Sequence, residues 1–135
     1  MSHAAEQSVL GAIMLDSRAY HRCAAVIGPD DFTAPEHRAL WLLLAELIET
    51  DAPVDAVTIG EIAERRNLEV GGLGYVLDVC NNTPGSASAD AYAEIVRGAS
   101  IRRQLRSIGR ALSVIESSGE TAMDEALAML AGIQC

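Results

Sequence analysis

The sequence predicts an all-α fold, in which a globular multi-helix head is followed by an antiparallel helical hairpin. Apolar residues recur at helical spacing along almost all of the 135 residues, and no stretch keeps the period of two that is typical of a strand. Half of the residues are apolar, but only one Phe, one Trp and three Tyr are present. The core must therefore consist of Ala, Leu, Ile and Val, a mixture that favours helix.

The head is predicted over residues 1–98, and its first part contains two helices. The first places Val9, Leu10 and Ile13 on one face. The second is expected over residues 17–27, where Gly and Pro follow it. Phe32, which comes next among acidic residues, is expected in the core.

Thr33-Ala34-Pro35-Glu36 has the form of a capping box and predicts the start of the strongest helix. His37 in its first turn is expected to be structural rather than a ligand or a base. More than half of the circumference of this helix is apolar, so it is predicted to be the centre of the bundle. Its apolar residues are Leu40, Trp41, Leu43, Leu44, Leu47 and Ile48.

Two shorter helices complete the head. Thr58-x-x-Glu61 predicts the start of one that ends at Asn67. Gly71-Gly72 is interpreted as a turn before a short helix that includes Tyr75, and residues 81–86 have the composition of a loop.

The hairpin is predicted over residues 99–135. One helical pattern runs from about Ser88 to Glu116, and Ser117-Ser118-Gly119 breaks it. Thr121-x-x-Asp124 is expected to cap a last helix. Because a turn of a few residues joins the two helices, they must lie antiparallel.

The hairpin carries a narrow apolar seam with heptad spacing. A two-helix arm would leave part of this seam in water, and two hairpins paired into a four-helix bundle would cover it. We therefore expect self-association through Ile101, Leu105, Ile108, Leu112, Met123, Leu127 and Leu130.

The head and the hairpin also differ in their charge. All ten basic residues are arginine, and the net charge is −9. Residues 1–95 hold five arginines and fifteen acids, whereas residues 96–135 hold five arginines and four acids. Arg102, Arg103, Arg106 and Arg110 cover about a quarter-turn of helix opposite the seam, at roughly 100° per residue. They form either a solvated face or a docking surface for an acidic partner or a neighbouring subunit's head.

Several function classes are excluded or disfavoured by composition. Without lysine the chain cannot form a Schiff base or the lysine-containing phosphate-binding loop. Its acidity disfavours the coating of duplex DNA. Cys23, Cys80 and Cys135 have no metal-ligand spacing and are expected to be reduced. No acid, base and nucleophile converge, so no active site, cofactor or metal is assigned to this chain.

Neither a signal peptide nor a membrane span is predicted. The N-terminus lacks a basic region and an apolar core, and the longest apolar run, residues 39–45, is far below the ~20 residues of a span. A cytoplasmic protein is expected.

An ordered series of motifs resembles the N-terminal domain of DnaB-type bacterial replicative DNA helicases over about residues 4–116. The series consists of Ala5-Glu6-Gln7-Ser8-Val9-Leu10-Gly11, Asp31-Phe32, His37-Arg38, Pro53-Val54-Asp55-Ala56-Val57-Thr58, Gly71-Gly72 with Tyr75-Val76-Leu77, Asn82-Thr83-Pro84, and Ala91-Tyr92-Ala93-Glu94-Ile95-Val96. The last helix matches by pattern only.

The resemblance implies that the chain is a non-catalytic assembly and docking domain. In the family the hairpins pair, three dimers form a collar, and the collar binds primase. ATP and Mg²⁺ belong to a separate C-terminal domain of the parent helicase, and DNA is reached only through the parent hexamer. No membrane is involved. The alternative is a stand-alone regulator, of phage or mobile-element type, that uses this fold to modulate a host helicase or primase.

Overall fold

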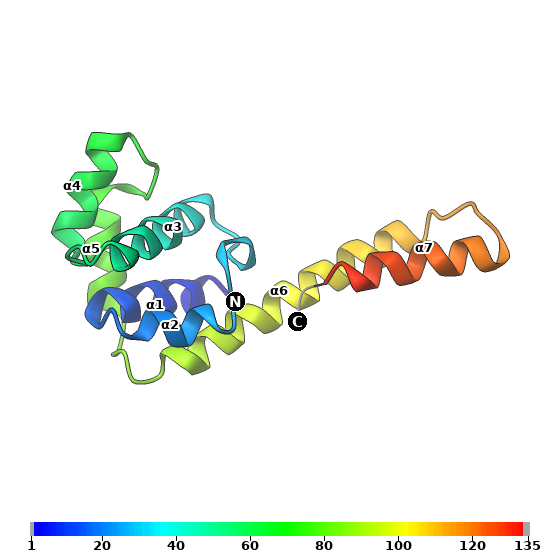
Figure 1. Cartoon of the computed structure of the whole chain (residues 1–135), viewed down its shortest axis with the longest axis horizontal. Helices are drawn as coiled ribbons and strands as arrows, with labels where there is room; N and C mark the ends of the chain where they lie inside the picture. Colours follow the sequence, from blue (N-terminus) through cyan, green and yellow to red (C-terminus); the bar gives the residue numbers. More distant parts are fainter. Residues whose placement is uncertain (1, 134–135) are drawn as a thin grey trace. The chain divides into compact units, whose positions relative to one another are not determined.

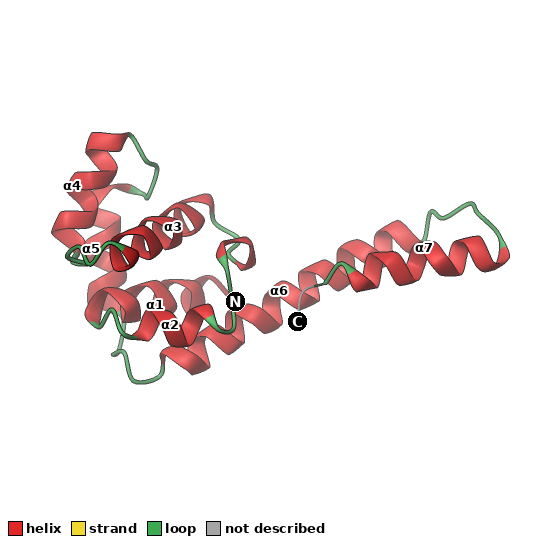
Figure 2. Cartoon of the chain, in the orientation of Figure 1, coloured by secondary structure: helices red, strands yellow, loops and turns green. Residues whose placement is uncertain are grey.

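The computed structural model describes residues 2–133, and every regular element in that part of the chain is helical (Figures 1 and 2). The all-α prediction is therefore confirmed. The chain divides into two compact units, residues 1–97 and residues 98–135. This division falls one residue before the predicted end of the head. Within residues 2–133 no helix is long and apolar enough to cross a membrane.

The first unit is a bundle around α1, so the prediction that the helix beginning near Pro35 forms its centre is wrong. It contains α1 (Ser2–Leu15), α2 (Ala19–Ala24), the short 3-10 helix η1 (Pro29–Asp31), α3 (Pro35–Glu49), α4 (Ala56–Arg66), α5 (Gly72–Asn82) and the first part of α6 (Ala89–Leu112). Helix α1 packs against α2, α3 and α5, and α4 packs against α5. The predicted core residues Leu10, Phe32 and Leu40 are fully buried or nearly so.

Helices α1 and α5 approach each other closely at Gly11. A Cβ atom at this position would lie 2.8 Å from the carbonyl oxygen of Val79 and would collide with the side chain of Thr83. The Thr83 hydroxyl is held in place because it donates a hydrogen bond to the same carbonyl at 2.7 Å. Only glycine allows this close packing of the two helices.

A buried polar network joins α1, α3 and α5. Glu6 and His37 are fully buried, and His37 Nδ1 lies 2.8 Å from Glu6 Oε1. His37 Nε2 lies 2.6 Å from the Tyr75 hydroxyl, which also accepts a hydrogen bond from Gln7 Nε2 at 3.0 Å. Because buried polar groups are costly unless they are paired, this set of bonds fixes how the three helices pack. His37 is structural, as predicted.

Thr33 belongs to this network and does not cap α3, so the predicted capping box is wrong. The N-cap of α3 is Ala34, whose backbone is extended and which makes no side-chain cap. The amide and hydroxyl of Thr33 donate to Glu6 Oε2 at 3.0 and 2.8 Å. A buried carboxylate needs several donors, and this requirement outweighs the local cap.

Helix α4 is capped three residues earlier than predicted. Its N-cap is Asp55, whose carboxylate accepts hydrogen bonds from the amide and the hydroxyl of Thr58 at 2.9 and 2.8 Å. Thr58 therefore lies inside the first turn and does not open the helix. Asn67 ends α4 in the left-handed conformation, so the predicted C-terminus is confirmed.

Other helix ends also differ from the prediction. Helix α2 covers only part of residues 17–27, because the amides of Val26 and Ile27 turn back to the Cys23 carbonyl. Helix α6 ends at Leu112 rather than Glu116 in a tightened turn, where the amide of Ile115 bonds to the Leu112 carbonyl.

Removal of the Glu6 carboxylate should destabilise the head. Glu6→Ala removes the acceptor of the buried His37 ring and of the Thr33 amide and hydroxyl, and breaking a buried pair in this way costs about 3–5 kcal/mol. Urea unfolding followed by the fluorescence of Trp41, the single tryptophan, measures this loss. Glu61→Ala, an exposed site on α4, is the control and should be close to neutral. Equal stability of the two variants contradicts the role given to Glu6.

The same carboxylate should make stability depend on pH. Burial raises the pKa of Glu6, but hydrogen bonds from His37 and Thr33 outweigh burial and hold the pKa below its ordinary value. A depressed folded-state pKa contributes stability that is fully present above the unfolded value of about 4.3 and is lost as the pH falls through the folded value. Unfolding free energies of the wild type should therefore fall more steeply with acid than those of Glu6→Gln. Parallel curves would show that Glu6 is not the titrating group.

Candidate functional site

The candidate site is the helical hairpin of residues 98–133. The part of α6 up to Leu112 runs beside α7 (Gly119–Ala131), and a loop of residues 113–118 joins them (Figure 1). The N-cap of α7 is Ser118, and Gly119 has a positive φ of 61°, so the helix begins before the predicted cap at Thr121. The Ser117 hydroxyl donates to Glu125 at 2.7 Å and ties the loop to α7.

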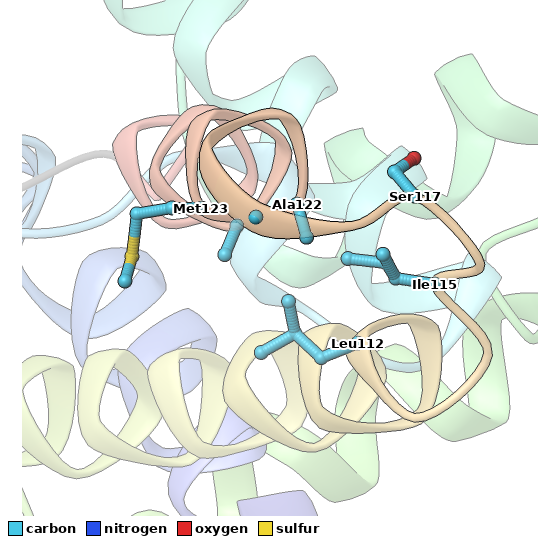
Figure 3. A pocket seen from close by; sticks show the side chains of 7 residues that line it. Leu112, Ile115, Ser117, Ala122 and Met123 are labelled. Carbon is cyan, nitrogen blue, oxygen red and sulfur yellow. The ribbon is translucent and has the colours of Figure 1, made fainter.

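The two helices leave a hollow of about 380 Å³ between them near the loop. Figure 3 shows Leu112 and Ile115 directed toward Ala122 of α7 across this hollow. The remaining lining residues are Ser117, Gly119, Met123 and Ala126. The hollow is open to solvent, so the apolar side chains that line it lack neighbours on that side.

Helix α7 directs small residues toward α6 and leaves large ones in water. Ala122 and Ala126, which line the hollow, are half-buried. Met123, Leu127 and Leu130 are 62%, 57% and 43% exposed. Their spacing of four and three residues places them on one face of α7.

Helix α6 also carries one exposed leucine. Leu105 is 45% exposed, although it belongs to the predicted heptad seam. The other predicted seam residues, Ile101, Ile108 and Leu112, are half-buried. We call Leu105, Met123, Leu127 and Leu130 the apolar stripe. The seven residues predicted for self-association therefore divide into three half-buried and four exposed side chains.

The four arginines of the predicted basic face also differ in their exposure to solvent. Arg102, Arg106 and Arg110 are exposed, and none of them forms an ion pair with another residue in the part of the chain described. A guanidinium nitrogen of Arg102 lies 3.6 Å from the position that a Cβ on Gly98 would take. Arg103 is half-buried and differs from these three.

Sequence reasoning missed the inward-facing alanines of α7 and the bond between Ser117 and Glu125. The four-residue spacing of Ala122 and Ala126 was a usable signal, since small residues allow two helices to approach each other. No sequence pattern indicated the hydrogen bond between Ser117 and Glu125, because this bond depends on the residue at which α7 begins.

The cysteines contribute no reactive site among residues 2–133. Burial, together with the charge of Asp90, raises the pKa of Cys23 to about 11. Burial also raises the pKa of Cys80, whose sulfur lies 3.6 Å from that of Met14. Neither thiol is a ready nucleophile, because the thiolate is the reactive form. Cys135 lies outside the described residues. Within residues 2–133 no three His, Cys, Asp or Glu side chains gather as a metal site requires.

Comparison with known proteins identifies relatives of this chain. The family model described as the DnaB-like helicase N-terminal domain matches residues 1–98. The replicative DNA helicase DnaB of Haemophilus influenzae is 36% identical over 111 residues, which cover 81% of this chain and 24% of that protein. The replicative DNA helicase DnaC of Bacillus subtilis is 39% identical over 123 residues, which cover 90% and 26%. The chain spans about a quarter of the length of these relatives.

Solved structures share the fold. The N-terminal domain of DnaB helicase from Mycobacterium tuberculosis matches with a TM-score of 0.86 and 32% identity, and the match covers 95% of this chain and 94% of that one. A DnaB-like replicative helicase described together with its interactions with primase matches with a TM-score of 0.75 over 97% of this chain and 31% of its own, at 21% identity. This second likeness concerns the fold alone. From the family match and the relatives it follows that the chain belongs to the DnaB-like helicase N-terminal domain family.

Proposed function

We propose that the chain is the non-catalytic assembly and docking domain of a hexameric replicative DNA helicase. The observation that carries this proposal is the apolar stripe, which places four large apolar side chains in water on one small hairpin. Full burial of such a side chain contributes about 1.5–3 kcal/mol. A second hairpin is the simplest cover, because two hairpins make a four-helix bundle.

The hollow between α6 and α7 supports the same proposal. Five of its seven lining residues are apolar, and one of them is Met123 of the apolar stripe. Side chains of a second hairpin can enter this hollow and restore normal packing density. Pairing therefore covers the stripe and fills the hollow in one step.

The further assembly follows from the family. Three dimers would build the collar, and the collar would dock primase and couple it to unwinding. Binding of ATP and Mg²⁺ is assigned to the parent's C-terminal domain, and contact with DNA to the parent hexamer. The family membership and the fold shared with a helicase described with its interactions with primase support these assignments.

Substitution of two stripe residues tests the pairing. Leu105→Asp with Leu127→Asp should convert the assembly into folded monomers, because each charge would be desolvated in the paired state. Sedimentation equilibrium measures the mass, and far-UV circular dichroism measures the helix content. Leu42→Asp with Val57→Asp is the matched control, since both residues are exposed but lie on the head. Unchanged mass of the stripe variant contradicts the proposal.

Titration with primase tests docking. The chain should bind the primase of its own organism saturably in isothermal titration calorimetry and comigrate with it in gel filtration. Absence of both signals contradicts docking and leaves the self-association proposal intact.

A further inference from the structure

We propose that the exposed arginines of α6, Arg102, Arg106 and Arg110, bind the acidic head of another copy of this chain. We call these three residues the arginine row. The contact rests on the proposed function, because it would join dimers that the apolar stripe has already formed. It is separate from hairpin pairing, because it uses other side chains and a different kind of interaction.

The arginine row is a continuous positive strip. Its members are four residues apart, so they follow one another at ~6 Å intervals along the axis of α6. No acidic residue occurs between Glu94 and Glu116, so α6 offers no partner on adjacent turns. The row therefore presents three exposed guanidinium groups that no described acidic side chain neutralises.

Pairing of two hairpins leaves most of the row accessible. Around α6, at ~100° per residue, Arg106 and Arg110 lie roughly 100° and 140° from Leu105 of the apolar stripe. The half-buried Ile108 and Leu112 lie on the other side of Leu105. A second hairpin that covers the apolar stripe therefore leaves Arg106 and Arg110 at the edge of the four-helix bundle.

The head supplies the complementary charge. Of its six arginines four are already in ion pairs, with Asp16, Asp90, Glu46 and Asp31, and Arg38 donates to backbone carbonyls. Fifteen acids share the head with these arginines, so a large negative excess remains. Glu61, Glu64 and Glu69, for example, are exposed and form no ion pair with any residue in the described range.

Carboxylates fit the row better than nucleic-acid phosphates. A chain with a net charge of −9 repels a polyanion at long range. Binding of single strands usually combines positive charge with aromatic stacking, and no aromatic residue follows Tyr92 in the sequence. Arginine also pairs with carboxylates in a bidentate manner, which gives such a contact a defined geometry.

The experiment measures the mass of the full chain at two salt concentrations by sedimentation velocity. Wild-type dimers should associate further at about 0.01 M salt and return to dimers at about 1 M, where the Debye length falls from ~30 to ~3 Å. The triple variant Arg102→Gln, Arg106→Gln and Arg110→Gln should lose the larger species and remain a dimer at both concentrations. A variant with lysine at the same three positions should retain part of the larger species.

A matched control separates the row from net charge. Ser118→Glu, Thr121→Glu and Ala128→Glu change the net charge by the same amount at exposed positions away from the apolar stripe, and this variant should keep the larger species. Loss of the larger species in the control as well contradicts the proposal, as does its persistence in the glutamine variant.

Two further outcomes also decide between the proposals. If a fluorescent oligothymidylate binds the wild type but not the glutamine variant, the row binds nucleic acid and the proposal is overturned. A wild type that is a dimer at both salt concentrations contradicts this inference alone, whereas one that is a monomer at both contradicts self-association as well.

Discussion

Two helices that pack against each other bury only the apolar side chains at their shared interface. The hairpin of residues 98–133 carries more large apolar side chains than this one interface covers. Helix α7 meets α6 through Ala122 and Ala126, and it leaves Met123, Leu127 and Leu130 in water. A hairpin built only for its own stability would place its large residues inside. This constraint connects the fold to the proposed function, because the exposed face and the unfilled hollow can both be resolved by a second copy.

In the head, a buried carboxylate constrains how the helices pack. The buried carboxylate of Glu6 takes hydrogen bonds from His37 and Thr33, and His37 bonds in turn to Tyr75. A carboxylate without solvent is tolerated only with such partners, so α1, α3 and α5 have little freedom to shift. Close packing at Gly11 adds a second restraint between α1 and α5. These contacts hold the helices of the head in one packed arrangement.

Periodicity was sufficient to predict the helices, their order and most of the head core, because burial of one helical face is a local pattern. Helix starts were less predictable. Thr33 has the right spacing for a cap, but its hydroxyl bonds to Glu6, 27 residues away in sequence. Leu105 fits the heptad seam, yet its burial depends on what α7 presents, and no property of α6 alone decides that. The arginine face was predicted as a group of four, but Arg103 is half-buried whereas the other three are exposed.

The central claim, that a second copy covers the apolar stripe, is tested most directly by the methyl signal of Met123. In a chain labelled with 13C-methyl methionine, NMR spectra are recorded over a range of protein concentrations. The Met123 signal should shift as the concentration rises, while that of Met14, buried in the head, should stay in place. A Met123 signal that is independent of concentration, in a chain whose mass remains that of a monomer, would contradict this claim.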